Sequence, residues 1–462
     1  MADKETNAML RRVAAASTIG TAAEYYDFFV YGTAAVLVFG AKFFPASDPL
    51  IGTLAAFATY AVGFVARPIG GIVFGHFGDK LGRKKALIVT ILIVGLGTFA
   101  IGLLPDYSQA GIWAPAALIF IRVLQGFGVG GEQAGAVLLT AEYAPPRERG
   151  FFASLVQLGA PAGFLIPSGI FAILTSALTH DQFMSWGWRL PFLGSIVLVV
   201  VGLYIRLRTE ESPVFAAIRA TQAVESRPVV EVVKQHGGVI VKGVGAKLIE
   251  ACTFGMYTMI VLAYGRAHQV SDALLLQTII VAVVLELIAI PLAGALSDRI
   301  GRRATFMAGA VLHVLLVAPL FHAIDSGNRL AIQTVMILAI TVGHSLCYAP
   351  QASLFPELFP ARVRCSGIAL IWQIGSLIGS GVLGLVAVKL IQATGGSSTG
   401  LIAYVAVLGI VSAISIFLLP ETAPVRRGGD LHDWIAPSRD AVSNQSNQSN
   451  EALAAATPAA RR

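Results

Sequence analysis

Residues 75–84 read Gly75-His-Phe-Gly-Asp79-Lys-Leu-Gly82-Arg83-Lys84, and residues 294–303 repeat the pattern as Gly294-Ala-Leu-Ser-Asp298-Arg-Ile-Gly301-Arg302-Arg303. Both copies keep the spacing of Gly, Asp and Gly, and a basic pair follows each copy. The copies lie 219 residues apart in a chain of 462 residues, and each copy ends a long apolar run. A charged turn at the same place in each half predicts a duplicated, two-part membrane protein.

A second repeated block supports the duplication. Glu142-Tyr-Ala-Pro-Pro-Arg-Glu-Arg149 returns as Glu357-Leu-Phe-Pro-Ala-Arg-Val-Arg364, with Glu, Pro and Arg in register. Because its offset is close to that of the first repeat, the two blocks together indicate two homologous halves rather than a chance match.

The composition indicates a chain that is solvated by lipid. Hydrophobic residues make up 56% of the sequence and charged residues only 13%, against about 25% charged in a soluble domain. The apolar runs are about 20 residues long, as a helix needs to cross a bilayer, and they lack the period-two alternation of barrel strands. The three cysteines have neither metal-ligand nor disulfide spacing.

The sequence predicts an all-α membrane protein of twelve transmembrane helices in two pseudo-symmetric six-helix bundles. The basic residues gather in short loops on one side, so both termini are expected in the cytoplasm. The net charge of +7 is therefore interpreted as a topology signal, and nucleic acid is not expected as a partner. The predicted spans are 17–40, 51–74, 85–104, 113–140, 151–176, 189–206, 239–264, 274–295, 305–324, 331–354, 365–392 and 400–419.

The predicted domain organisation follows these spans. Residues 1–206 form the first bundle, 207–238 a polar cytoplasmic linker, and 239–420 the second bundle. Residues 421–462 are Ser-, Asn-, Gln- and Ala-rich towards their end, a composition that predicts a disordered cytoplasmic tail.

The repeated turns are predicted to form a cytoplasmic gate. Glycine permits close approach and positive φ, the Asp can cap the next helix, and the Arg can bridge to a neighbouring carboxylate. The alternative is that the basic residues only set the topology. We expect one four-residue charge cluster for each half, Asp79, Arg83, Glu142 and Arg149 in the first and Asp298, Arg302, Glu357 and Arg364 in the second, with Gly75, Gly82, Gly294 and Gly301 at the turns.

With these turns the chain resembles the major facilitator superfamily, over nearly all of residues 15–420. Within it, several blocks are similar to the metabolite:proton symporter family. Two positions depart from that pattern: Tyr25 stands where Trp is common, and Gln133 stands where carriers of the shikimate type have Trp. The blocks are Gly20–Gly32, Arg67-Pro-Ile-Gly70, Arg122-Val-Leu-Gln-Gly126 through Glu132, and Trp188-Arg-Leu-Pro-Phe192.

The resemblance implies a monomeric, proton-coupled symporter in the bacterial plasma membrane. It would take up a small polar organic acid of the shikimate or α-ketoglutarate type by alternating access, with protons as coupling ion and no other cofactor. A proline or betaine carrier is the main alternative. A drug efflux antiporter is disfavoured because 159–163 read Gly-Ala-Pro-Ala-Gly, and a sensor because the chain has no sizeable soluble domain. An enzyme is not expected, since neither a nucleophile elbow nor a P-loop is present.

Charged residues inside the predicted spans are the candidates for the transport pathway, because a charge in the membrane needs a partner or a wet cavity. Glu24 and Asp27 share a helix face, so they either titrate during transport or pair permanently with bases. Arg67 lies about 10 Å inside its span by helical rise, and it either binds an anionic substrate or pairs with one of these carboxylates.

The fourth span supplies Arg122, Gln125 and Gln133 near one face, with Glu132 to the side. The resemblance links Arg122 to proton coupling. Gly126–Gly131 also fits the GxGxxG pattern, but without a preceding strand it predicts close helix packing instead of a dinucleotide site.

In the second half, Lys247 and Glu250 are spaced to pair with each other or to contact substrate. Glu286 is a candidate partner for a base across the cavity. Gln373 and His344 are weaker candidates, because a lone polar residue often only makes a helix-packing hydrogen bond. Among the aromatic residues Tyr25, Tyr26, Tyr257, Tyr348 and Trp372, we expect Tyr26 and Trp372 to line the cavity.

Overall fold

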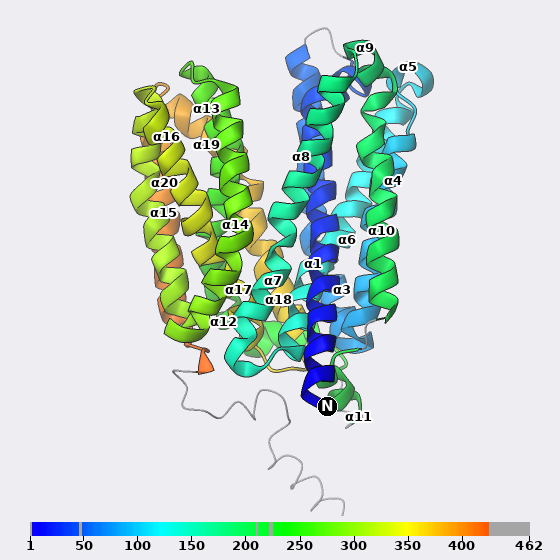
Figure 1. Ribbon diagram of the computed structural model, residues 1–462, viewed down its shortest axis with the longest axis vertical. Helices are drawn as coiled ribbons and strands as arrows, with labels where there is room; N and C mark the ends of the chain where they lie inside the picture. The colour runs from blue at the N-terminus through cyan, green and yellow to red at the C-terminus, as the bar shows by residue number, and fades with distance from the viewer. Residues whose placement is uncertain (1, 46–48, 209–210, 221–224, 425–462) are drawn as a thin grey trace, which may run out of the picture.

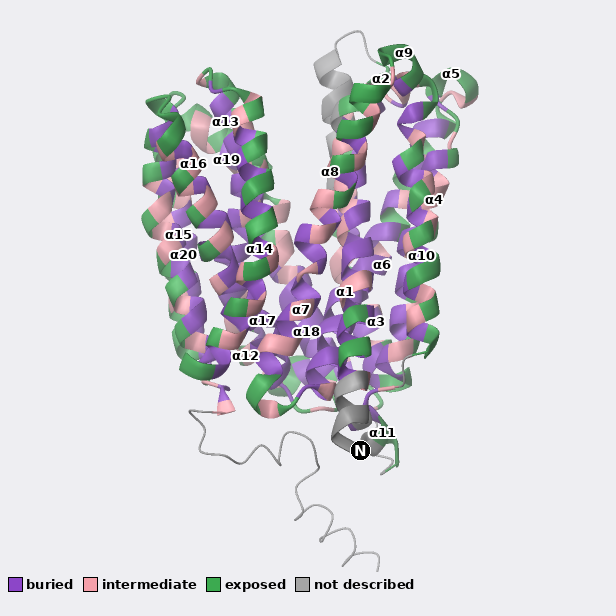
Figure 2. Cartoon of the chain, in the orientation of Figure 1, coloured by how far each residue is buried: buried purple, intermediate pink, exposed green. Residues whose placement is uncertain are grey.

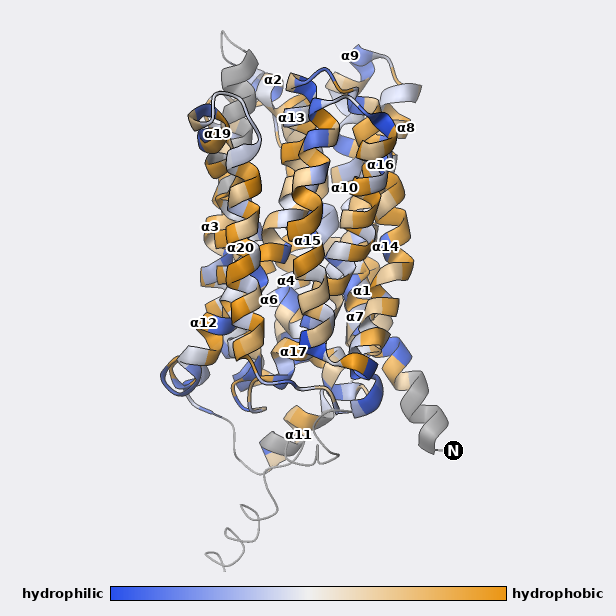
Figure 3. Cartoon of the chain, turned by 90° about the vertical axis from the view of Figure 1, so that its left-hand side faces the viewer, coloured by the Kyte–Doolittle hydropathy of each residue, from blue (hydrophilic) through white to orange (hydrophobic). Residues whose placement is uncertain are grey.

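The computed structural model describes residues 2–45, 49–208, 211–220 and 225–424, and it contains helices but no strand within these ranges. Among these described residues, ten helical segments are long and apolar enough to cross a membrane. Figure 3 shows the apolar residues as a broad band around the helices, with hydrophilic residues at the two ends. The prediction of an all-helical membrane protein is confirmed.

The first half consists of long helices joined by short connections. A π-helical turn at Ala35–Phe39 (η1) extends the first helix, and Leu158 separates α7 from α8. The elements are α1 (Ala2–Ala34), α2 (Gly40–Lys42), α3 (Pro49–Leu81), α4 (Arg83–Leu103), α5 (Tyr107–Ala110), α6 (Trp113–Tyr143), η2 (Pro146–Glu148), α7 (Arg149–Gln157), α8 (Gly159–Ala177), α9 (His180–Gln182), η3 (Phe183–Gly187) and α10 (Arg189–Arg208).

The second half follows the short helix α11 (Pro213–Ala220), and three of its long helices contain a π-helical turn. The elements are α12 (Pro228–Gly255), η4 (Met256–Ile260), α13 (Val261–Ala267), α14 (Asp272–Ile300), α15 (Arg302–Asp325), α16 (Arg329–Ile337), η5 (Leu338–His344), α17 (Ser345–Glu357), α18 (Arg364–Ser376), η6 (Leu377–Gly381), α19 (Leu383–Ala393) and α20 (Thr399–Leu418).

Figure 1 shows the two halves side by side, with α1 to α10 on one side and α12 to α20 on the other. They contact each other through α3 with α18 and through α7 with α14. The ribbons converge at the end where the N-terminus lies and diverge towards the other end. Buried residues gather around α7, α17 and α18 where the halves converge (Figure 2).

Glycines allow the close packing of α3 against α6. A Cβ built on Gly126 would lie 2.1 Å from the backbone oxygen of Gly63, and one on Gly130 would lie 2.2 Å from the backbone oxygen of Arg67. Neither position accepts a side chain, so the glycine-rich run serves helix packing, as the sequence predicts.

The segments around the predicted linker and tail differ from expectation. Helix α12 begins at Pro228, inside the predicted linker, because proline suits the first turn of a helix, and it kinks at His236 (φ −122°, ψ 18°). The predicted tail begins with ordered residues, since Thr422 and Ala423 are buried. The remainder of the tail, 425–462, lies outside the described residues.

Candidate functional site

The third glycine of each repeated turn adopts a backbone conformation that other residues avoid. Gly82 has φ 109° and Gly301 has φ 113°, values that are nearly restricted to glycine. A Cβ on Gly82 would also lie 2.1 Å from Oε2 of Glu211. These two glycines therefore let the chain turn directly from α3 into α4 and from α14 into α15.

The helices that follow these turns are capped by glutamates. The backbone N–H groups of Arg83 and Lys84 donate to Glu211 at 3.1 and 3.3 Å, and the N–H groups of Arg302 and Arg303 donate to Glu421 at 2.9 and 3.1 Å. The expectation that the turn's own Asp caps the next helix is thus wrong. The sequence contains a signal for these caps, because Glu211 precedes Ser-Pro and Glu421 precedes Thr-Ala-Pro at equivalent places in the two halves.

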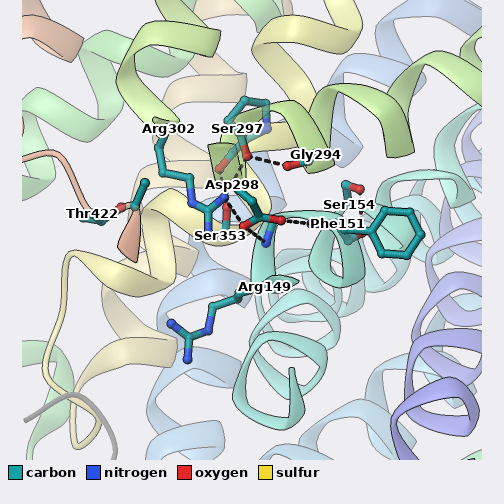
Figure 4. A network of polar contacts seen from close by, with 12 residues as sticks. Arg149, Phe151, Ser154, Gly294, Ser297, Asp298, Arg302, Ser353 and Thr422 are labelled. Carbon is teal, nitrogen blue, oxygen red and sulfur yellow. Dashed lines mark hydrogen bonds and ion pairs between the residues drawn. The ribbon is translucent and has the colours of Figure 1, made fainter. Parts of the chain in front are cut away.

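The Asp residues of the turns instead cap helices of the opposite half. Backbone N–H groups of Cys365 and Ser366, at the start of α18, donate to Asp79 at 3.0 and 2.8 Å. Those of Gly150 and Phe151, at the start of α7, donate to Asp298, both at 2.9 Å (Figure 4). An anion at a helix N-terminus is stabilised by the exposed N–H groups and the helix dipole.

The first glycine of each turn makes this approach possible. A Cβ on Gly75 would lie 3.0 Å from the Cα of Ser366, and one on Gly294 would lie 2.3 Å from Oγ of Ser154. Each repeated turn therefore contacts the opposite half in two ways. Its first glycine allows the backbones to approach closely, and its Asp caps a helix of the other half.

Ion pairs complete this contact and cross between the halves. Glu142 accepts from Arg83 at 3.4 Å and from Arg364 at 3.2 Å. Glu357 pairs with Arg302 at 3.4 Å and with Arg149 at 3.3 Å. The pairing of arginine with these two glutamates is as predicted, but Arg149 and Arg364 have exchanged places, so the expected grouping of four residues from one half is wrong.

In the middle of the first half, Asp27 is held by three side chains. Arg122 donates to it at 3.1 Å, Thr98 donates at 2.5 Å, and Gln125 donates as well. The guanidinium of Arg122 lies 4.0 Å from the ring centre of Tyr31. Asp27 and Arg122 are both buried, so α1, α4 and α6 enclose an ion pair.

Glu24, the other carboxylate of α1, is buried one helical turn before Asp27. In α3 the Arg67 guanidinium lies 4.3 Å from the ring centre of Phe64. Glu132 forms an ion pair with Arg206 and accepts from Thr90. Arg206 was not predicted as a site residue because its place at the end of a span made it a topology signal.

The second half contains a larger buried cluster. Lys247 forms the predicted ion pair with Glu250, and Gln351 donates to Glu250 at 3.2 Å. His344 connects the two carboxylates, with Nδ1 at 2.6 Å from Glu286 and Nε2 at 3.4 Å from Glu250. The partner of Glu286 is thus a histidine of its own half, which the sequence favoured only weakly.

A hydrogen-bonded junction around Tyr348 joins the halves. Its hydroxyl lies 3.1 Å from the hydroxyl of Tyr25 and accepts from Gln133 at 3.1 Å, while its backbone oxygen accepts from Gln157 at 3.1 Å. Nearby, Gln373 donates to the backbone oxygen of Gly130 at 2.9 Å. The predicted Gln133 and Gln373 thus lie between the halves.

The two aromatic residues expected to line a cavity are buried in different places. Tyr26 packs in the hydrophobic core of the first half and donates to the backbone oxygen of Pro191 at 2.6 Å, while Tyr25 occupies the interface. Trp372 lies edge-on to Phe355 and has its ring centre 5.9 Å from Nζ of Lys247. Of the two, Trp372 is therefore next to a charged cluster and Tyr26 is not.

Comparisons with known proteins agree with this architecture. The family model described as "Sugar (and other) transporter" matches residues 13–250 and 250–426. Solved structures of the proton:xylose symporter XylE superpose with TM-scores of 0.75 and 0.72 over 90% of this chain and 96% and 97% of theirs. At 18% and 17% identity these structures show the fold alone.

Curated relatives are much closer in sequence. The chain is 40% identical to the inner membrane metabolite transport protein YhjE of Escherichia coli, over 89% of this chain and 94% of the relative. It is 37% identical to the shikimate transporter of E. coli, with coverages of 89% and 95%. It is 35% identical to the proline/betaine transporter of Salmonella typhimurium, with coverages of 90% and 84%. The chain therefore belongs to the sugar (and other) transporter family of the major facilitator superfamily, as a multi-pass transport protein of the bacterial inner membrane.

Proposed function

We propose that the protein is a proton-coupled symporter that takes up a small polar organic acid of the shikimate or α-ketoglutarate type by alternating access. The buried pair of Asp27 and Arg122, 3.1 Å apart, carries this proposal. An ionisable pair inside a membrane protein is costly and marks a substrate or proton pathway. The 37% identity to the shikimate transporter supports an organic acid as substrate.

The chemistry follows from the charges around Asp27. When Asp27 binds a proton, Arg122 loses the negative charge that balances it, and a buried cation without a partner is unstable. An anionic substrate restores the balance, so the protein favours binding of a proton and a substrate anion together. No cofactor other than the proton is required.

The topology that we propose has twelve spans, with α1 and α3 crossing the membrane in addition to the ten segments above. The excess of Lys and Arg on the side of the repeated turns supports cytoplasmic termini. The turns would then close the cytoplasmic side, and the described state would face outward. Two bundles, 1–206 and 239–420, would rock about a central site as a monomer.

The test is transport by the purified protein in vesicles with an imposed pH gradient. We expect Asp27→Asn to abolish uphill accumulation and to retain exchange of substrate across the membrane, since the amide keeps the shape but does not titrate. The matched control is Asp272→Asn, because Asp272 forms a solvent-exposed pair with Arg266 at 2.7 Å. Accumulation by Asp27→Asn that matches the control would refute the role of Asp27.

The substrate is identified by competition among shikimate, α-ketoglutarate, citrate, proline and betaine. The alternative function, uptake of proline or betaine, rests on the 35% identity to a proline/betaine transporter, of whose length the chain covers 84%. Competition by proline and betaine alone would favour this alternative. Competition by the three acids would favour the main proposal.

A further inference from the structure

The buried cluster of Lys247, Glu250, His344 and Glu286 holds one proton more than it would with a neutral histidine and two ionised carboxylates. Both ring nitrogens of His344 face carboxylate oxygens, Nδ1 at 2.6 Å from Glu286 and Nε2 at 3.4 Å from Glu250. A neutral imidazole has one N–H donor and one bare nitrogen that only accepts. The bare nitrogen would face the lone pairs of a carboxylate with no hydrogen between them, so one further proton lies on the ring or on a carboxyl group.

The charge balance of the cluster leads to the same conclusion. Glu250 and Glu286 supply two negative charges, and Lys247 supplies one positive charge. Without a further proton the cluster would have a net charge of −1 in a buried, membrane-embedded position, which is strongly unfavourable. The remaining titratable side chains beside the cluster are phenols, a thiol and an imidazole, which have no negative charge to balance near neutral pH: Tyr348 and Cys347 of α17, His313 of α15, Tyr257 of η4 and Tyr25 of α1. Glu24 lies one residue before Tyr25 on α1, in the first half.

The cluster also contacts the junction between the two halves. The Tyr348 ring stacks on His344, with ring centres 4.9 Å apart and an angle of 22°. The Tyr348 hydroxyl in turn contacts Tyr25 and Gln133 of the first half at 3.1 Å. A change in the hydrogen bonds of the His344 ring therefore acts directly on a residue that connects the halves.

We infer that the second half has a proton-binding site of its own, formed by Lys247, Glu250, His344 and Glu286, and that proton exchange there is coupled through Tyr348 to the contact between the halves. This site is separate from Asp27, which lies in the other half with other partners. The proton enters with substrate and leaves to the cytoplasm, so each transport cycle carries a proton beyond the one at Asp27. The transport of this additional proton rests on the proposed symport function, whereas its presence in the cluster does not.

The location of the proton is tested without substrate on the purified protein labelled with ¹⁵N-histidine. The His344 signals are assigned by their loss in His344→Gln, and the exposed His322 serves as an internal reference. Two N–H nitrogens at His344 support the site, as does one bare nitrogen together with an infrared band of a protonated carboxyl that Glu286→Gln or Glu250→Gln removes. A bare nitrogen without such a band overturns it.

The transport role is tested with paired variants in vesicles. His344→Gln removes the ring that connects Glu286 to Glu250 and leaves Lys247 as the only basic group of the cluster, so we expect it to lose transport. His344→Gln combined with Glu286→Gln restores the charge balance without the proton, so exchange should recover and the proton-to-substrate ratio should fall by one. The probe is whichever of shikimate, α-ketoglutarate, citrate, proline or betaine the wild type accumulates.

The control for this pair is Asp106→Asn in the loop before α5. Asp106 pairs with Lys42 at 3.2 Å, and the hydroxyl of Ser108 lowers the pKa of this carboxyl, so it stays ionised and its removal should leave the ratio unchanged. A wild-type ratio in the double variant, or a double variant no better than His344→Gln, overturns the coupled proton. A wild type that ignores the pH gradient would instead refute the proposal for Asp27.

Discussion

The carboxylate of Asp79 accepts a hydrogen bond from the backbone N–H of Ser366 at 2.8 Å, across the boundary between the two halves. Asp79→Asn keeps the shape but removes the charge, and a charge at a helix N-terminus contributes about 1–2 kcal/mol when partly buried. We therefore expect the closed contact between α3 and α18 to open roughly tenfold more often. Alkylation of Cys365, which is buried beside Asp79, measures this opening.

The measurement uses a background in which Cys252 and Cys347 are replaced by Ser, so that Cys365 is the reporter. Asp272→Asn in the same background is the control, because Asp272 forms a solvent-exposed ion pair with Arg266 and neither residue belongs to α3 or α18. Equal alkylation rates of the Asp79 variant and this control would show that the cap does not hold the halves together.

The crossed ion pairs predict a coupling that spans the halves. Glu357 pairs with Arg149 of the first half at 3.3 Å, whereas Arg364 of its own half pairs with Glu142. In double-mutant cycles of thermal unfolding, Glu357→Gln should couple to Arg149→Gln by about 1–3 kcal/mol. Its coupling to Arg364→Gln should be smaller, and the opposite order would contradict the crossed arrangement.

Substitution of the turn glycine Gly82 should destabilise the protein, because the strain would be concentrated at this turn. Its φ of 109° is nearly restricted to glycine, so Gly82→Ala should cost about 1–3 kcal/mol and lower the melting temperature. Gly169→Ala is the matched control, because a Cβ there meets no atom within 4 Å and alanine favours a helix by about 1 kcal/mol. Equal melting temperatures of the two variants would exclude backbone strain at the turn.

Several of these features could be predicted from the sequence because they depend on local order. The repeated glycines and the partners Glu142 and Glu357 are examples, since spacing and charge type are visible in one chain. The capping of α18 by Asp79 was not predictable, because spacing does not reveal which helix N-terminus lies across an interface. The exchange of Arg149 and Arg364 was hidden for the same reason.

The charged cluster around His344 marks another limit of sequence reasoning. A lone histidine in an apolar span usually makes a packing hydrogen bond, and only the three-dimensional arrangement places two glutamates on its ring. Glu211 and Glu421, in contrast, stand at equivalent positions before a Pro-containing stretch. These two glutamates are thus visible in the sequence as part of a third repeated block.

A substitution at Tyr348 can test the contact between the halves independently of the charged cluster. Tyr348→Phe removes the hydroxyl that contacts Tyr25 and Gln133 at 3.1 Å but keeps the ring that stacks on His344. Two hydrogen bonds are lost, each worth about 1 kcal/mol, so the closed state should weaken by about 2 kcal/mol and Cys365 should be alkylated roughly 30-fold faster. Accumulation driven by the pH gradient should persist, because the surroundings of Asp27 are unchanged.

The control is Tyr204→Phe on α10, because this tyrosine is exposed and lies outside the junction around Tyr348. Alkylation in this variant should equal that of the parent. If Tyr348→Phe also matched the parent, the hydroxyl contacts would not hold the halves together. If it lost accumulation while the closed state stayed intact, Tyr348 would instead act on the proton or substrate directly, because only its hydroxyl has been removed.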